Sequence, residues 1–195
     1  MSPEQHRTFL AAYPDRPTLE RVEEWISTFR ERYPGIRWSP ESQLHFTLRF
    51  FGNLDDSALT TASRVLEAEA PLLRPLAFPL NGLGAFPDWR RPRVLWIGAG
   101  AGGEELEELA RRLDLKFGTA GLGRADKPFR AHLTIGRVRE GNALEKEVAE
   151  RMRREAVATP PFTVSVLHLM LSRLGREGAK HEVFRTVRLG APGNA

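Results

Sequence analysis

The chain has 195 residues, enough to bury a substantial core as one domain or as two closely packed lobes. Its net charge of +4 is compatible with a polyanionic partner but does not identify one. The chain has no cysteines, which excludes disulfides, thiolate metal sites and thiol nucleophiles. It has no apolar run of the roughly 18 residues that span a bilayer, and its first residues lack the apolar segment of a secretory signal. We therefore expect a cytoplasmic protein that acts away from membranes.

The first half of the chain predicts the order strand, helix, strand, helix, strand. The turn-rich segment 82–92 then separates the two halves of the chain. The expected elements are a strand at 8–12, a helix from Pro17 to Tyr33, a strand at 44–51, a helix capped by Asp55 or Asp56 that runs to about Ala70, and a strand at 76–80.

The second half predicts the same order. The glycine-rich segment 98–103 lacks a Walker lysine and the Gly-x-Gly-x-x-Gly register, so it predicts a turn and not a nucleotide site. The expected elements are a strand at 93–99, a helix near 104–117, a strand at 129–138, a helix capped by Asn142 and Glu145 that runs to about Ala158, and strands at 162–174 and 182–189 around a hairpin at 175–178.

This duplication predicts an α+β fold in a single domain, 1–195, with two pseudo-symmetric lobes. Each lobe would be a small, mainly antiparallel sheet with outer helices, and the active-site cleft would lie between the lobes. We expect lobe 1 at approximately 1–85 and lobe 2 at approximately 90–190, with a crossing of the last strands between the lobes left open.

A short motif occurs twice: His-Phe-Thr-Leu at 45–48 and His-Leu-Thr-Ile at 132–135. Alternate side chains of a strand share a face, so each histidine faces the same way as the threonine two residues later. An imidazole can exchange a proton near neutral pH, and a hydroxyl can hydrogen-bond an oxyanion. Two lobes facing each other would place His45 and His132 across one cleft, as the two halves of an acid–base site.

Three further residues are candidates for substrate binding. Arg49 has the same strand parity as the first histidine, which leaves phosphate contact and solvent exposure equally open. Arg137 lies five residues after the second histidine, so it needs a bulge or a strand end near Gly136 to reach the same face. Phe9 could stack on a terminal base or pack in the core.

The chain resembles the 2H phosphoesterase superfamily, and most closely its bacterial and archaeal RNA 2′,3′-cyclic phosphodiesterases, historically called 2′-5′ RNA ligases. It departs from their more usual pattern at Ala131, where proline is more common, and near His181 to Phe184, where a tyrosine is more common. The resemblance covers nearly the whole chain and is carried by both His-x-Thr motifs and by segments 7–11, 82–87, 93–97, 129–137 and 171–174.

The resemblance implies hydrolysis of a terminal 2′,3′-cyclic phosphate on RNA to a 2′-phosphomonoester, with no metal or other cofactor. It also implies a capacity for reversible 2′-5′ ligation. In that case His45 is the proton donor and His132 the proton acceptor, although an exchange of these roles would be invisible in the sequence. Thr47 and Thr134 would hold the phosphate and Arg137 would add a permanent cation. The expected partner is RNA with 2′,3′-cyclic phosphate ends, bound by a monomer.

Two other functional classes are alternatives to a phosphodiesterase. A noncatalytic module that binds RNA ends would use the same basic cleft, but it has no need for two histidines in matching frames. A metallohydrolase would need carboxylate or further histidine ligands at suitable spacing, and none accompanies either motif. The paired motifs therefore favour the metal-independent phosphodiesterase.

Overall fold

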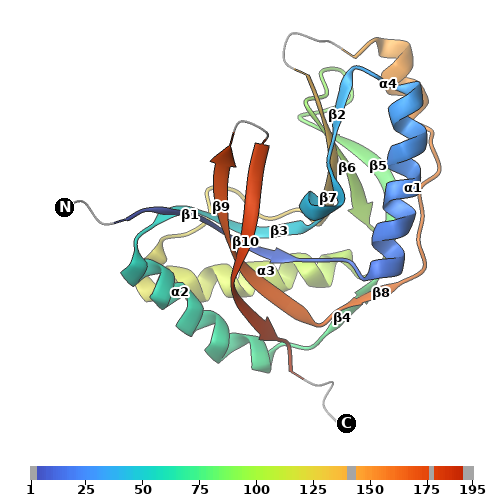
Figure 1. Ribbon diagram of the computed structural model, residues 1–195. Coiled ribbons are helices and arrows are strands. Elements are labelled where there is room, and N and C mark those ends of the chain that lie inside the picture. Colours follow the sequence, from blue (N-terminus) through green and yellow to red (C-terminus); the bar gives the residue numbers. More distant parts are fainter. Residues whose placement is uncertain (1–3, 140–143, 176–177, 191–195) are drawn as a thin grey trace.

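Two four-stranded antiparallel sheets form the framework of the computed structural model, which describes residues 4–139, 144–175 and 178–190 (Figure 1). The helices are α1 (Arg16–Arg32), α2 (Asp56–Glu69), α3 (Gly103–Phe117) and α4 (Lys146–Arg153). The strands are β1 (His6–Ala12), β2 (Ile36–Trp38), β3 (Phe46–Leu54), β4 (Leu76–Phe78), β5 (Leu80–Phe86), β6 (Val94–Ala99), β7 (His132–Val138), β8 (Phe162–Val164), β9 (Val166–Gly175) and β10 (Gly178–Arg188).

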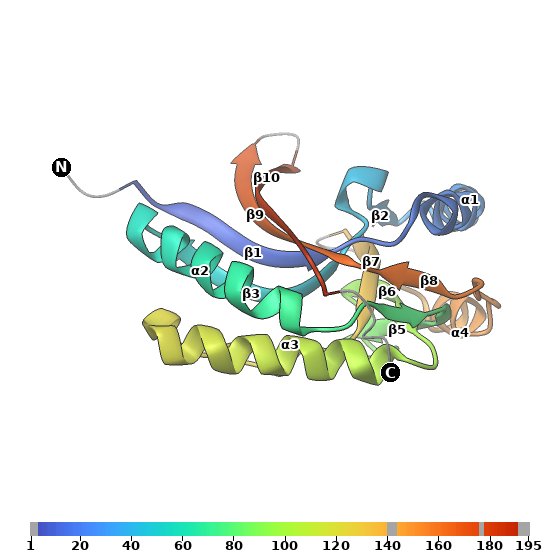
Figure 2. The same ribbon diagram turned by 90° about the horizontal axis from the view of Figure 1, so that it is seen from below.

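The first sheet has the strand order β10-β9-β1-β3, and the second has the order β2-β7-β6-β5. Strands β4 and β8 form a separate antiparallel pair. Helices α2 and α3 pack on the first sheet, whereas α1 and α4 pack on the second (Figures 1 and 2). The expected α+β class, with antiparallel sheets and outer helices, is confirmed. Among the described residues, no helix has the length and apolar character needed to cross a membrane.

The two sheets do not follow the expected boundaries of 1–85 and 90–190. Strands β2 and β5, from the first half of the chain, pair with strands of the second half. The last strands β9 and β10 cross to the first sheet, the possibility that the sequence left open. Each lobe is therefore built from both halves of the chain. This exchange depends on hydrogen bonds between segments far apart in sequence, which local residue patterns do not reveal.

Strand β5 occupies a segment that the sequence analysis assigned to a turn. Gly84 pairs with Trp96 of β6, and the indole ring lies directly over it. A Cβ atom at Gly84 would stand 2.1 Å from that ring, so the glycine makes room for a cross-strand side chain and does not mark a turn. The strand ends at the cis peptide bond between Phe86 and Pro87.

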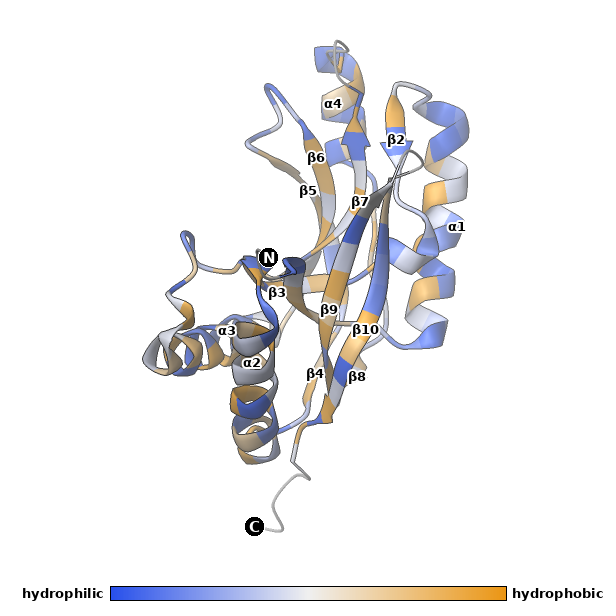
Figure 3. Ribbon diagram, turned by 60° about the vertical axis from the view of Figure 1, so that its left-hand side comes forward, coloured by the Kyte–Doolittle hydropathy of each residue, from blue (hydrophilic) through white to orange (hydrophobic). Residues whose placement is uncertain are grey.

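Local sequence signals account for the helices and their ends. Asp15 and Asp55 accept hydrogen bonds from backbone N–H groups at the starts of α1 and α2, at 3.0 and 2.8 Å. Buried residues recur every three to four positions along α1, so that one side of the helix is hydrophobic and packs toward the second sheet (Figure 3). Helix α4 ends earlier than expected because residues 157–159 hydrogen-bond to β5. The expected cap Asn142 lies outside the described residues.

Strand β7 contains the irregularity that the position of Arg137 requires. Consecutive residues of β6 pair with Thr134 and Gly136, so Ile135 is an extra residue in the strand. Such a bulge shifts the alternation of side chains by one position. Ile135 and Gly136 are both buried, and Arg137 lines the same cavity as Thr134.

Strand β3 contains a matching bulge that the sequence analysis did not include. Consecutive residues of β1 pair with Thr47 and Arg49, so Leu48 is the extra residue. After the bulge Arg49 turns into the core, and Phe50 takes the cavity face that Thr47 occupies. The prediction that Arg49 shares the face of His45, with phosphate contact or solvent exposure, is therefore wrong.

The guanidinium of Arg49 instead joins the first sheet to α3. The side chain is 3% exposed and forms an ion pair with Asp114. It also donates hydrogen bonds to the backbone carbonyls of Leu122 and Gly123, at 2.9 and 3.0 Å. The two terminal nitrogens of the guanidinium thus compensate the burial of its charge, whereas Nε is buried without a hydrogen-bond partner among the described residues.

Replacement of Arg49 by leucine should lower the free energy of unfolding by about 3–5 kcal/mol, because it removes the buried partner of Asp114 and of two carbonyls. Urea denaturation measures this loss. Arg124→Leu is the matched control, because Arg124 bonds to the same carboxylate at 2.5 Å but is 53% exposed. Its loss should cost no more than about 1 kcal/mol. Equal losses in the two variants would contradict a dominant role for the buried guanidinium.

Candidate active site

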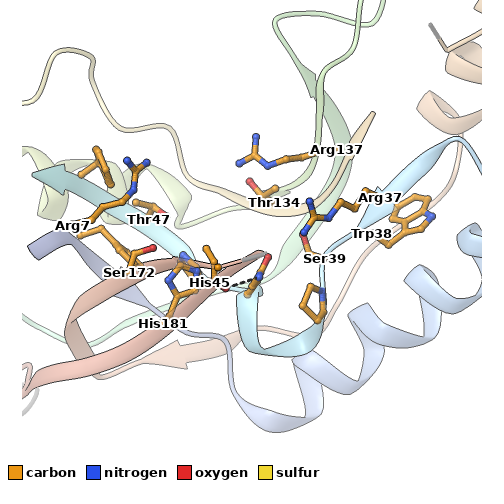
Figure 4. A pocket seen from close by; sticks show the side chains of 16 residues that line it. Arg7, Arg37, Trp38, Ser39, His45, Thr47, Thr134, Arg137, Ser172 and His181 are labelled. Carbon is orange, nitrogen blue, oxygen red and sulfur yellow. Dashed lines mark hydrogen bonds between the residues drawn. The ribbon is translucent and has the colours of Figure 1, made fainter. Parts of the chain in front are cut away.

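A cavity of about 440 Å³ lies between the two sheets. Its walls come from β1, β3, β9 and β10 of the first sheet, from β2 and β7 of the second, and from the segment that joins β2 to β3 (Figure 4). The described residues of the lining include three arginines, Arg7, Arg37 and Arg137, and no aspartate or glutamate. This charge distribution favours an anionic ligand.

The two threonines of the repeated motif both line the cavity, each from a different sheet. Thr47 comes from β3 and Thr134 from β7, and Arg137 lies beside Thr134 on the same strand (Figure 4). Two hydroxyl groups and a guanidinium provide donors that can hydrogen-bond the oxygens of a phosphate. The structure thus brings together three of the expected substrate-binding residues.

His45, the residue directly before β3, lines the cavity and is surrounded by other rings. It stacks on Phe9, with centroids 5.1 Å apart, and forms a T-shaped contact with His181, with centroids 5.5 Å apart. Burial, and secondarily the charge of His181, lower the pKa of His45 to about 4. Nδ1 of His45 is buried without a hydrogen-bond partner among the described residues. The ring is therefore neutral near neutral pH in the free protein.

His132 lies on β7, two residues before Thr134 and on the same side of the strand, but it is not among the residues that line the cavity. Its Nδ1 is 2.6 Å from the backbone carbonyl of Arg130. A carbonyl oxygen only accepts hydrogen bonds, so Nδ1 carries the proton and Nε2 of the neutral ring has the free lone pair. Burial is the main cause that lowers the pKa of His132, and the charge of Arg137 lowers it further.

Phe9 has a different place from the one expected for a base-stacking residue. Its ring borders the cavity but is only 3% exposed. One side is stacked on His45, and the ring forms a T-shaped contact with His181, with centroids 4.9 Å apart. Of the two alternatives for Phe9, packing is therefore the one that the structure favours, and the ring supports His45.

Several residues that line the cavity are not among those predicted from the sequence. Arg7 shares the strand parity of Phe9, and this signal was available. Arg37 and His181 reach the cavity through strand pairings that no local pattern shows, because β2 pairs with β7 and β10 pairs with β9. The side-chain amide of Gln43 donates to the carbonyl of Ala179 at 3.0 Å and so connects β10 to the segment before β3.

No three histidine, aspartate or glutamate side chains come together in a possible metal site within the described parts of the chain. The three arginines around the cavity would repel a cation. The site thus offers general acids and bases, hydroxyl donors and fixed positive charge.

Comparisons with known proteins agree with this chemistry. The chain matches the model of the 2′-5′ RNA ligase superfamily over residues 15–176. The RNA 2′,3′-cyclic phosphodiesterase of Archaeoglobus fulgidus is 34% identical over 148 residues, which cover 76% of this chain and 80% of the relative. The enzyme of the same name from Methanothermobacter thermautotrophicus is 29% identical over 182 residues, which cover 92% and 98%.

Solved structures share the fold over almost the whole chain. A protein of Thermus thermophilus has a TM-score of 0.81 and 26% identity, with 96% of this chain and 100% of that chain covered. Escherichia coli LigT in complex with 3′-AMP has a TM-score of 0.74 and 20% identity, with 95% and 99% covered. The family match over most of the sequence, together with these relatives, shows that the chain belongs to the 2′-5′ RNA ligase superfamily of 2H phosphoesterases, as its paired motifs indicated.

Proposed function

We propose that this enzyme hydrolyses the terminal 2′,3′-cyclic phosphate of RNA to a 2′-phosphomonoester by acid–base catalysis, without a metal ion. The observation that carries the proposal is the convergence of His45, Thr47, Thr134 and Arg137 on one cavity that has no lining carboxylate among its described residues. Relatives that match most of this chain are named for this activity. The LigT complex with 3′-AMP adds that a protein of this fold binds a nucleotide.

The reaction needs three things from the protein. A base must take a proton from water as its oxygen attacks phosphorus, and an acid must protonate the 3′-oxygen as its bond to phosphorus breaks. Donors must also stabilise the charge on the other phosphoryl oxygens. Attack and departure lie on opposite sides of phosphorus, so an acid and a base from two facing sheets suit the geometry. Each of them contributes about 10²–10⁴ in rate.

His132 is suited to be the base. The carbonyl of Arg130 holds the proton of the neutral ring on Nδ1, which leaves the lone pair of Nε2 to accept a proton from water. Burial keeps the ring neutral in the free enzyme. The same hydrogen bond stabilises the protonated ring that forms when water has been deprotonated.

His45 is assigned as the acid, and this role requires the substrate. In the free enzyme its pKa is about 4, mainly because of burial. A phosphodiester bound at Thr47 brings a negative charge close to the ring, and a nearby negative charge raises the pKa of a histidine. Substrate binding therefore promotes the protonated state that can give a proton to the leaving 3′-oxygen.

Thr47, Thr134 and Arg137 would hold the phosphoryl oxygens. Fixed donors directed at developing charge contribute about 10²–10³ in rate each. If the 5′-hydroxyl of a second RNA replaced water, the same proton transfers would give a 2′-5′ linkage. Hydrolysis and ligation thus differ in the nucleophile and not in the catalytic groups.

The direct test is incubation of the protein with an RNA oligonucleotide that ends in a 2′,3′-cyclic phosphate, in the presence of EDTA. We expect conversion to the 2′-phosphomonoester, and ³¹P NMR against synthetic 2′- and 3′-phosphate standards identifies the position. Loss of activity in EDTA and its return with zinc or manganese would contradict the two-histidine mechanism. Binding without turnover would instead indicate a module that only recognises RNA ends.

The second prediction concerns the two histidines. His45→Ala and His132→Ala should each lower kcat by about 10² or more, and the double variant should lose little more than the worse single variant. Thr47→Val and Thr134→Val should cause smaller losses, because each removes one hydroxyl. His6→Ala is the control, because His6 hydrogen-bonds Asp56 outside the cavity lining. Near-normal kcat in either histidine variant, with unchanged thermal melting, would exclude that histidine from the chemistry.

The pH dependence follows from the pKa directions. The profile of kcat/KM reports the free enzyme, in which both histidines have a pKa below 6.5. Productive turnover needs one ring protonated and the other neutral, so kcat/KM should be bell-shaped, with its maximum below pH 6.5 and a decline above it. The profile of kcat should lie at higher pH, because bound phosphate raises both pKa values.

Replacement of His181 by glutamine tests which limb of the pH profile of kcat/KM reports the pKa of His45. It removes the neighbouring charge that lowers the pKa of His45, so the limb that belongs to His45 should move to higher pH. A flat profile of kcat/KM between about pH 5 and 8 would contradict acid–base catalysis by these histidines.

A further inference from the structure

One side of the cavity carries an exposed aromatic ring that the reaction itself does not use. Phe50 of β3 is 45% exposed and lines the cavity. The guanidinium of Arg7, on β1, lies 4.5 Å from the centroid of its ring, and Arg7 lines the cavity as well. The other large hydrophobic residues that are exposed in the described parts of the chain lie outside the cavity lining.

The bulge in β3 is the reason for this exposure. In a regular strand Arg49 would share the face of Thr47, but the extra residue Leu48 places Phe50 there instead. Phe50 follows His45 by five residues, as Arg137 follows His132. The two walls of the cleft thus present different groups at equivalent positions, a cation on β7 and an aromatic ring on β3.

The other aromatic rings in the lining are not free for stacking. Phe9 is 3% exposed and packs against two histidines. Trp38 is 9% exposed, and its ring packs near Phe29 and Gly136. Among the aromatic side chains of the lining, other than histidine, Phe50 is therefore the one with an accessible ring.

A ring next to a guanidinium fits one part of the proposed substrate. RNA that ends in a cyclic phosphate continues only in the 5′ direction, and each further nucleotide offers a base that stacks on an aromatic ring and a phosphodiester that pairs with a cation. Thr47 pairs with Ala11 and Phe50 with Phe9, so the bulge leaves them two ladder positions apart, about 7 Å along the strand at roughly 3.3 Å per residue. Unlike Arg137 at the equivalent position of β7, the ring has no donor for a phosphoryl oxygen, and it lies where the base of an adjoining nucleotide can reach it.

We propose that Phe50 and Arg7 bind the nucleotide that precedes the reacting end, Phe50 through its base and Arg7 through its phosphodiester, so that the enzyme prefers RNA ends to single cyclic nucleotides. This inference rests on the proposed function for the identity of the substrate. It adds a specificity site that is separate from the reacting groups.

The test compares kcat/KM for a trinucleotide that ends in a 2′,3′-cyclic phosphate with kcat/KM for the corresponding nucleoside 2′,3′-cyclic phosphate. The readout is the ratio of the two values. The loss of one base–aromatic stack corresponds to about 5- to 150-fold, so Phe50→Ala should lower the ratio by a factor in that range, and Phe50→Trp should retain it. Leu72→Ala, which removes another exposed hydrophobic residue outside the cavity lining, should leave the ratio unchanged.

The role of Arg7 has an independent readout in the salt dependence. A contact with one phosphate of a single strand contributes about 0.7 to the slope of log affinity against log salt concentration. Arg7→Gln should therefore reduce by about 0.7 the difference in slope between trinucleotide and mononucleotide. Arg90→Gln is the matched control, because Arg90 is 91% exposed and does not line the cavity.

The inference is overturned if the wild-type ratio is near one, or if Phe50→Ala lowers kcat/KM equally for both substrates. The second result would assign the ring to the terminal base or to the local packing. Fluorescence anisotropy with a labelled trinucleotide that ends in a 2′-phosphate decides the question even without turnover. Equal affinity of wild type and Phe50→Ala for this probe would also overturn the inference, whereas absence of hydrolysis would count only against the proposed function.

Discussion

The set of side chains that line the cleft depends on the extra residue that follows the motif threonine in each of the strands β3 and β7. Leu48 in β3 and Ile135 in β7 interrupt the regular pairing directly after the motif threonine. Up to that point the chain alternates as a strand should, so the histidine and threonine share a face. After it the alternation is reversed, and a residue that strand parity would direct to the core lines the cavity instead. The bulges therefore decide which side chains meet the substrate: Arg137 on one wall and Phe50 on the other.

The same bulge is accommodated by opposite means on the two strands. On both strands, the residue directly after the extra one faces the core. On β7 this is Gly136, where a Cβ atom would stand 2.9 Å from the side chain of Ile36. On β3 it is Arg49, whose long side chain reaches α3 and pairs with Asp114. One position thus requires the absence of a side chain and the other requires a long charged one. This explains why the two copies of the motif agree in the histidine and threonine but differ in the residues that follow.

Much of the fold could be read from local patterns, and the errors have a common physical cause. The helical periodicity of α1 and α3 and the cap at Asp55 depend on neighbours in sequence, and these predictions are close to the structure. Strand β2 has three residues and exists because it pairs with β7, so no local signal could reveal it. The sequence predicts a turn at Gly84. The glycine is needed because the indole ring of Trp96, on another strand, leaves no room for a side chain, and no local pattern shows this contact.

The residues of the candidate site also fall into those that the local sequence predicts and those that depend on contacts between distant segments. Strand parity alone groups the histidine and threonine of each motif, and the position of Arg137 called for a bulge near Gly136 that the structure contains. In the first copy no residue at a distance calls for a bulge, and regular strand parity places Arg49 on the wrong face and leaves Phe50 out of the cavity. His181 reaches His45 through the register of β9 and β10, which the sequence does not specify.

The surroundings of the two histidines suggest how one residue type can serve in opposite roles. His132 has a fixed tautomer, because the carbonyl of Arg130 holds the proton on Nδ1. His45 lies among rings, and its Nδ1 is buried without a partner in the described residues, so the charged form is costly in the free protein and its pKa falls to about 4. A histidine in that position can act as an acid only when an anion stands beside it. The proposed substrate is such an anion, and its binding would supply the negative charge that the protonated ring lacks. Protonation of His45 would then be coupled to the presence of phosphate, which would keep the empty site from holding a buried positive charge.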